Sequence, residues 1–157
     1  MDLAFIGVED HTVVFSDTDS SAPNRLRTLI NENGIKSLYV SSYEGSGTDF
    51  ARLTDSFRNM GWNVGMLKPS DIGLANSNDS LISPAFQDYI GTSKKDYNIL
   101  FIPVPDSRHT YELVSDINTK GSGVLLNIRS GSISRPQLRT SLSGIDSSHV
   151  FAMIDRN

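Results

Sequence analysis

Short apolar segments alternate with amphipathic segments along most of this chain. The apolar segments predict buried strands, because they are short, carry few charges and are rich in β-branched and aromatic residues. These segments are Leu3–Val8, Thr12–Phe15, Ser37–Ser42, Trp62–Leu67, Asn98–Val104, Val124–Ile128 and Val150–Ile154. The amphipathic segments repeat their apolar residues at helical spacing and predict helices. They are Arg25–Asn33, Asp49–Met60, Pro84–Ile90, His109–Lys120 and Ser134–Ser141.

Local signals mark where several of these helices begin and end. Ser83 and Ser134 precede helices as candidate N-caps, and a proline follows each of them within the first turn. Gly34, Gly61 and Gly121 follow helices and are expected to end them. The polar stretch 69–80 has no such pattern and is predicted to be a loop.

Near-continuous apolar strands that alternate with helices predict an α/β fold. We expect a mainly parallel sheet of about six or seven strands with helices on both faces. Leu3–Val8 and Thr12–Phe15 are predicted to form an N-terminal hairpin within an extension that covers residues 1–22. In such sheets the ligand-binding edge lies at the carboxyl ends of the strands. The loops expected at this edge are 41–48, 68–80, 103–109 and 129–134.

Composition and charge narrow the class of protein. A chain of 157 residues and 17.2 kDa has the size of one domain, so we expect residues 1–157 to form a single unit. The net charge of −4 argues against a nucleic-acid-binding protein. The absence of cysteine excludes disulfide scaffolds, Cys-ligated zinc and thiol nucleophiles. Since no apolar run could span a bilayer and no signal peptide follows Met1, a cytoplasmic location is expected.

A glycine-rich loop joins the strand predicted at 37–42 to the helix predicted at 49–60. Its residues are Glu44, Gly45, Ser46, Gly47 and Thr48. A strand, a glycine loop and a helix together form the geometry that cradles phosphate groups, because loop N–H groups and the helix N-terminus both favour an anion. A tight turn between strand and helix has the same sequence pattern, so the glycines alone leave both interpretations open.

Seven segments around this loop occur in an order that is typical of one protein family. They are Asn24–Asn31, Ile35–Ser42, Phe50–Val64, Leu81–Gln87, Asp96–Ile102, Gly123–Arg135 and, more loosely, Val150–Asn157. From Pro23 onward the chain resembles the cytoplasmic domain of bacterial tyrosine autokinases, which are P-loop proteins of capsule and exopolysaccharide assembly related to the ParA and MinD ATPases. The resemblance implies a P-loop NTPase-like three-layer α/β sandwich, with residues 44–48 in place of the family's ATP-binding loop.

The chain departs from this family where phosphoryl transfer takes place. The family's P-loop carries a lysine that reaches the phosphates, whereas no lysine lies between Lys36 and Lys68. The first acidic motif is replaced by Lys68-Pro69, and the second by Ile102-Pro103-Val104-Pro105. Because proline cannot ligate magnesium, the resemblance implies a degenerate, non-catalytic relative, a pseudokinase or pseudo-ATPase.

Three further positions bear on this interpretation. Asp71 and Asp106 are the carboxylates nearest to the altered motifs, but their positions in the sequence do not align with those of the family's aspartates. The family's C-terminal tyrosine cluster is missing, since the last tyrosine is Tyr111. The family's oligomerisation helix is only partly matched at Asn24–Ile30, so a homo-oligomer stays an open question.

From the resemblance we expect a kinase-like accessory or regulatory protein of bacterial exopolysaccharide biosynthesis or export. Its expected partner is a membrane polysaccharide co-polymerase or a related kinase or synthase component, which would hold it peripherally at the inner membrane. No cofactor and no metal are expected. The candidate contacts with a ligand or partner are charged residues near the carboxyl edge: Lys68, Asp106, Arg108, Arg129 and Arg135.

Two alternative functions remain open. In the first, loop 43–48 still holds ATP or ADP, Lys68 or Arg129 supplies the positive charge, and the chain is a residual ATPase or kinase. In the second, the chain is a ParA-like positioning protein that has lost its nucleotide switch.

Other residues carry weaker functional signals. Val13–Ser20 resembles the signature of haloacid-dehalogenase phosphotransferases, with Asp17 as nucleophile and Asp19 as acid/base. No acidic pair follows a later strand to complete that site, and an acidic turn explains the pattern as well. An acidic segment, residues 1–24, and a more basic C-terminal third suggest electrostatic docking. The three histidines, His11, His109 and His149, share no metal-ligand spacing.

Overall fold

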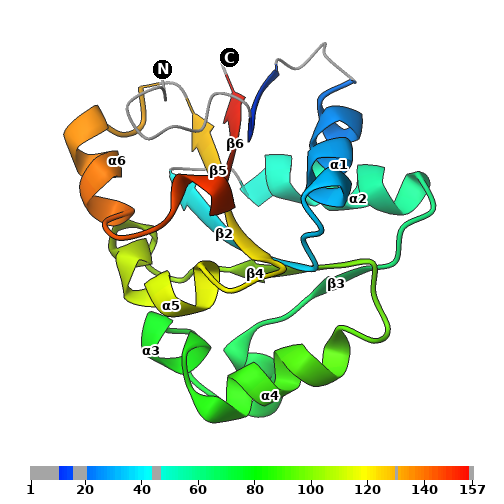
Figure 1. Cartoon of the computed structure of the whole chain (residues 1–157), viewed down its shortest axis with the longest axis vertical. Coiled ribbons are helices and arrows are strands. Elements are labelled where there is room, and N and C mark those ends of the chain that lie inside the picture. The colour runs from blue at the N-terminus through cyan, green and yellow to red at the C-terminus, as the bar shows by residue number, and fades with distance from the viewer. Residues whose placement is uncertain (1–10, 16–20, 44–46, 130, 156–157) are drawn as a thin grey trace.

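The strands form one twisted sheet at the centre of the molecule (Figure 1). The computed structural model describes residues 11–15, 21–43, 47–129 and 131–155. Six strands of this part of the chain lie in the order β1-β6-β5-β2-β4-β3, and every neighbouring pair is parallel. Their bounds are β1 Thr12–Phe15, β2 Ser37–Tyr43, β3 Val64–Met66, β4 Ile99–Pro103, β5 Ser122–Arg129 and β6 Val150–Asp155.

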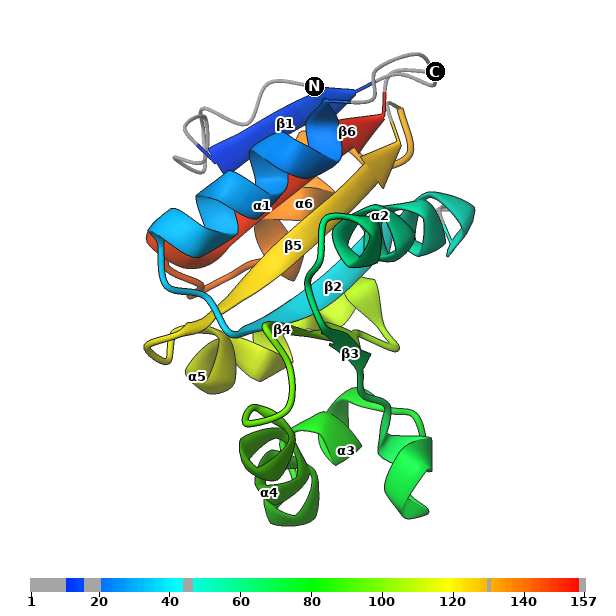
Figure 2. The same ribbon diagram turned by 90° about the vertical axis from the view of Figure 1, so that its right-hand side faces the viewer.

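Helices cover both faces of this sheet. Two of them, α1 (Ala22–Glu32) and α2 (Gly47–Asn59), lie on one face (Figure 2). The other face is covered by α3 Asn78–Leu81, α4 Pro84–Ser93, α5 Val114–Ile117 and α6 Arg135–Ser141. Short 3₁₀ helices occupy Pro69–Ile72, Ser107–Leu113 and Ser147–His149. The structure is therefore the three-layer α/β sandwich that the sequence pattern predicts.

Each face of the sheet has its own hydrophobic core, because successive side chains of a strand point to opposite faces. Leu38 and Val40 of β2 belong to the same core as Phe57 of α2. Tyr39, between them, lies in the opposite core with Phe86 of α4. This double burial explains why the strands read as nearly continuous apolar runs.

The buried phenol of Tyr39 makes the stability of the fold depend on pH. Its side chain is 2% exposed, and burial raises the pKa of Tyr39 from 10.0 to about 12. The unfolded chain therefore loses this proton at a lower pH than the folded chain does. The contribution to stability is complete below pH 10 and is lost as the pH rises through 12.

We expect the free energy of unfolding to fall by about 1.4 kcal/mol between neutral pH and about pH 11 on account of Tyr39. Urea unfolding at a series of alkaline pH values measures this loss. Tyr39→Phe should remove that part of the pH dependence, whereas Tyr97→Phe, at a tyrosine that is 39% exposed, should retain it. An equal alkaline loss in wild type and Tyr39→Phe would contradict the prediction.

The predicted helix signals are largely confirmed. Ser83 Oγ accepts a hydrogen bond from the Phe86 N–H at 3.3 Å. Ser134 and Gln137 form a reciprocal capping box, with bonds of 3.3 and 3.2 Å. Gly34 follows the end of α1 with a φ of 65°, a conformation that favours glycine.

Two predicted segments differ from the structure. The stretch 69–80, predicted to be a loop, contains the 3₁₀ helix Pro69–Ile72 and most of α3. The helix predicted at His109–Lys120 is a 3₁₀ helix, Ser107–Leu113, followed by the short α5. Side chains compete here for the carbonyl groups that an α-helix would use: the Asn78 amide donates to the His109 carbonyl at 3.2 Å, and Thr110 Oγ1 donates to the Ser107 carbonyl at 2.6 Å.

The N-terminal hairpin stays a prediction. Leu3–Val8 lies outside the described residues, and β1 pairs in parallel with β6. Within the described ranges, none of the helices combines the length and the apolar character that a membrane span requires.

Candidate functional site

A hollow opens at the carboxyl ends of the central strands, where the sequence predicts the functional edge. Its volume is about 240 Å³, and its lining comes from the end of β2, the segment after β4 and the segment after β5. The lining residues are Ser42, Tyr43, Pro105, Asp106, Ser107, Arg108 and Ser132. We call this space the carboxyl-edge hollow. It adjoins the point where β2 leads into the glycine-rich loop.

Hydrogen bonds from buried side chains hold the end of β2 in place. The Tyr43 hydroxyl lies 2.9 Å from Ser141 Oγ of α6 and donates to the Ser107 carbonyl at 3.3 Å. Ser41 Oγ and Thr110 Oγ1 are 2.9 Å apart and fully buried. The strand end, the 3₁₀ helix after β4 and α6 are thus joined into one wall of the hollow.

A tight turn after β5 forms another part of the lining. Ser132 donates to the Arg129 carbonyl through both its N–H (2.9 Å) and its hydroxyl (2.6 Å). Gly131 has a φ of 84°, which a residue with a side chain rarely adopts. This turn directs Ser132 towards the hollow and leads the chain into α6.

The side chains of Asp106 and His109 form a close hydrogen-bonded pair beside the hollow. Asp106 Oδ2 and His109 Nδ1 are 2.6 Å apart, and both side chains are about half exposed. The His109 ring contacts Tyr111 edge-on, with ring centroids 5.6 Å apart. The Asp106 carboxylate therefore already has a close partner within its own turn.

Asn78 is the residue that shapes this segment, and no sequence signal indicates it. Its side chain is 5% exposed. Its amide donates to the carbonyls of Asp106 and His109 at 3.0 and 3.2 Å and to Glu112 Oε1 at 3.2 Å. Its Oδ1 accepts from the Asp106 N–H at 3.1 Å. An asparagine in a polar stretch reads as a turn residue, so the sequence alone conceals this role.

The predicted contact residues are only partly brought together. Asp106 and Arg108 line the hollow. Arg129 ends β5 and Arg135 begins α6; both are exposed, but neither lines the hollow. Lys68 follows β3, which β4 separates from β2 in the sheet.

The glycine-rich loop itself stays a prediction. Glu44, Gly45 and Ser46 lie outside the described residues. The backbone of Gly47 and Thr48 forms the first turn of α2. The described elements on either side are the strand and the helix that a phosphate-binding loop would connect.

The altered acidic motifs have a clear structural setting. Pro103 is the last residue of β4 and stands opposite Val40, while β2 continues to Tyr43. Along a strand, the backbone N–H groups of successive residues point alternately to the two neighbouring strands. The N–H of Val104 points to β2, because it donates to the Val40 carbonyl at 2.9 Å. The backbone nitrogen of Pro103 therefore points to the side of β3, where that strand has already ended at Met66. Because no strand residue lies there to accept a hydrogen bond, the missing N–H of proline removes no bond from the sheet.

The other nearby carboxylate, Asp71, serves the turn after β3. Its Oδ2 accepts from the Lys68 N–H at 3.0 Å and from the Tyr89 hydroxyl at 3.2 Å. Asp71 thus stabilises local structure at the outer strand. In the part of the chain that the structure describes, no three acidic, histidine or cysteine side chains gather as metal ligands would.

The remaining candidate residues are dispersed. Asp17 and Asp19 lie outside the described residues. His11 stacks on Phe151 with a centroid distance of 4.6 Å, and His149 Nδ1 lies 2.7 Å from the Ser122 carbonyl. Both of these histidines are at the amino edge of the sheet, opposite the hollow.

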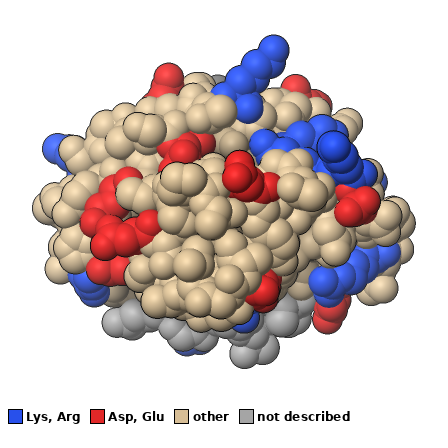
Figure 3. Space-filling model, turned by 90° about the horizontal axis from the view of Figure 1, so that it is seen from below, with Lys and Arg blue, Asp and Glu red and all other residues tan. Residues whose placement is uncertain are grey.

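Charge is mixed over the surface that carries α4. Figure 3 views this face from below Figure 1 and shows acidic and basic side chains interspersed, with neither sign covering it. Such a face generates no strong field of one sign.

Comparison with known proteins identifies the architecture. No family model and no curated protein matches the sequence. A solved structure described as "BceF Tyrosine Kinase Domain" matches with a TM-score of 0.58, at 14% identity, over 86% of this chain and 76% of that chain. The chain thus has a P-loop NTPase-like three-layer α/β fold, which it shares with that tyrosine kinase domain.

Proposed function

We propose that this chain is a kinase-like protein that does not transfer phosphate and that acts by binding another protein. The observation that carries the proposal is the carboxyl edge of β4: the strand ends in Pro103, and the next carboxylate, Asp106, is paired with His109. Phosphoryl transfer depends on metal ions held by carboxylates and on cations that neutralise the phosphates. The hollow supplies one acidic and one basic side chain, Asp106 and Arg108, whose charges offset each other.

The sequence resemblance suggests the class of partner. We expect the chain to bind a polysaccharide co-polymerase or a related kinase or synthase component in bacterial exopolysaccharide biosynthesis or export. Arg108 and Arg135 are exposed charges at the carboxyl edge that such a contact could use. Charged side chains of this kind contribute mainly to partner choice and association rate.

Calorimetric titration with ATP and ADP, with and without Mg²⁺, tests the non-catalytic part of the proposal. We expect no saturable heat, which corresponds to a dissociation constant weaker than about 1 mM. Co-purification of the tagged chain with a polysaccharide co-polymerase then tests the partner. Arg108→Glu should reduce that capture, whereas Arg58→Glu, on α2 beside Asp55, should not.

Residual nucleotide binding is the alternative, and the position of the hollow favours it. The hollow lies at the end of β2, from which the chain continues into the glycine-rich loop. Arg108 lines the hollow, whereas Lys68 and Arg129 do not. Micromolar binding of ATP or ADP would overturn the non-catalytic proposal. Thr48→Ala, Gly47→Val and Arg108→Ala should then each weaken that binding.

A further inference from the structure

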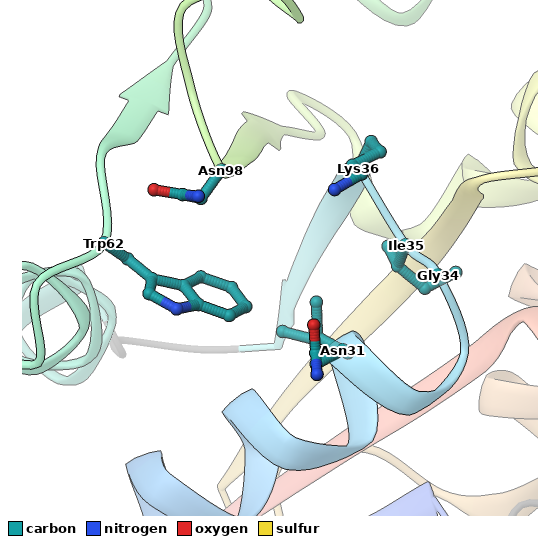
Figure 4. Close-up of a pocket in the computed structure, with 7 residues that line it drawn as sticks. Asn31, Gly34, Ile35, Lys36, Trp62 and Asn98 are labelled. Atoms are coloured by element: carbon teal, nitrogen blue, oxygen red, sulfur yellow. The ribbon is translucent and has the colours of Figure 1, made fainter.

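A second pocket lies at the amino edge of the sheet, opposite the carboxyl-edge hollow. It has a volume of about 120 Å³ and lies between the end of α1 and the starts of β2, β3 and β4. Ile30 and Ile35 form buried parts of its wall, and the remaining lining is largely polar. Figure 4 shows Trp62 and Asn98 on one side of this space and Lys36 on the other. We call it the amino-edge pocket.

The aromatic wall of this pocket is held in place by neighbouring rings and charge. The Trp62 ring contacts Phe57 edge-on, with centroids 5.7 Å apart. The Arg27 guanidinium lies over the Trp62 ring, 5.9 Å from its centroid. The indole extends towards Asn31 in Figure 4 and forms the aromatic part of the pocket lining.

The polar groups of the pocket are oriented but not fully used. Asn98 Oδ1 accepts from the Asn63 N–H at 2.7 Å, which fixes the amide and leaves its NH₂ group as a donor. Among the described residues, the side chains of Asn31 and Lys36 have no hydrogen-bond or ion-pair partner, and both are exposed. The amides of Asn31 and Asn98 and the ammonium group of Lys36 therefore offer hydrogen-bond donors around the indole. The amide oxygen of Asn31 is a free acceptor.

The charges around the pocket favour neither an anionic nor a cationic ligand strongly. Lys36 contributes a positive charge, while the C-terminal end of α1 contributes partial negative charge from its carbonyl groups. A neutral ligand that carries both donors and acceptors satisfies this mixture better than a purely anionic or cationic one. An apolar ring without hydroxyl groups would leave the amides and the ammonium group unsatisfied.

Size points to a single ring. A closed cavity of about 150 Å³ holds one benzene molecule, so an open pocket of 120 Å³ takes one six-membered ring that protrudes partly into solvent. We propose that the amino-edge pocket binds one sugar ring, with its apolar side against Trp62 and its hydroxyl groups on Asn31, Asn98 and Lys36. Aromatic surfaces combined with amide side chains suit such a ring because it has apolar C–H groups and a hydroxyl rim.

This proposal does not depend on the function proposed above. The pocket and the hollow lie at opposite edges of the sheet, so either can bind its ligand whether or not the other does. The two are also tested by different ligands and different variants.

Fluorescence tests the pocket directly, because Trp62 is the only tryptophan of the chain. The whole protein is titrated with the methyl glycosides of glucose, galactose, mannose and glucuronic acid, and with benzoate as a ring that lacks hydroxyl groups. We expect at least one glycoside to change the Trp62 emission saturably, with a dissociation constant on the order of 1 mM. Benzoate should give no saturable change.

Variants separate a bound sugar from a general solvent effect. Asn31→Ala and Lys36→Ala should each weaken glycoside binding about tenfold without lowering the melting temperature, since both side chains are exposed. Lys95→Ala, at an exposed lysine outside the pocket, should leave the affinity unchanged. The proposal is overturned if no glycoside in the panel binds at about 10 mM, if benzoate alone binds, or if both pocket variants retain wild-type affinity.

Discussion

Gly123→Val is expected to lower the free energy of unfolding by about 3 to 4 kcal/mol, the largest loss among the variants considered. Gly123 lies in β5, where a Cβ atom would stand 2.8 Å from the His149 carbonyl oxygen. It would also stand 3.2 Å from the Phe151 ring and 3.4 Å from Leu38 Cδ2. The backbone carbonyl leads directly into β6 and cannot swing aside as a flexible side chain would, so the strands themselves must move apart.

Urea unfolding measures this loss, and Gly91→Ala provides the control. Gly91 lies within α4, and a Cβ atom there would meet nothing within 4 Å. Alanine should therefore raise stability by about 0.5–1 kcal/mol through its better helix propensity. A loss below about 1 kcal/mol for Gly123→Val would show that β5 and the start of β6 do not approach as closely as described.

Asn78→Ala is expected to cost about 3 kcal/mol and to loosen the wall of the carboxyl-edge hollow. The substitution removes the four hydrogen bonds that join Asn78 to Asp106, His109 and Glu112. Backbone groups that lose a partner in a partly buried setting cost more than the net value of the bonds themselves. The stability loss should therefore be accompanied by a local change after β4.

Hydrogen exchange at the Asp106 amide reports this local change, because that N–H donates to Asn78 Oδ1. We expect its exchange to accelerate in Asn78→Ala more than that of amides in β5. Glu112→Ala removes only one contact of Asn78, made by an exposed residue, and should cost less than about 1 kcal/mol. Unchanged Asp106 exchange in Asn78→Ala would contradict the role assigned to Asn78.

The strands and the two-sided burial could be predicted because the information is local. The apolar run Asn98–Val104 becomes β4, and the run Ser37–Ser42 becomes β2, each within two residues of the expected bounds. The order of the strands carries no local signal, since the pairing joins segments that are distant in the chain. The sequence resemblance, rather than the hydrophobic pattern, supplied the P-loop NTPase-like expectation that the fold comparison confirms.

The hollow lies at the edge where the sequence analysis expects a site, but its detailed geometry does not follow from the sequence. The carboxyl ends of β2, β4 and β5 do form the hollow, and Asp106 and Arg108 do line it. The alternative nucleotide-binding function named Lys68 or Arg129 as the source of positive charge, but β4 lies between the strand of Lys68 and β2. The 3₁₀ geometry of Ser107–Leu113 depends on the distant Asn78 side chain, which no pattern near His109 indicates.

The pairing of β1 with β6 constrains the order in which the protein can form during synthesis. Thr12 stands opposite Ala152 and Phe15 opposite Asp155, so the first described strand finds its partner in the last. Nascent β1 must therefore remain unpaired with β6 until residue 155 has left the ribosome, even though α1 and β2 emerge much earlier. We expect the outer strand to dock last, with Val13 completing the core on the α1 side only then.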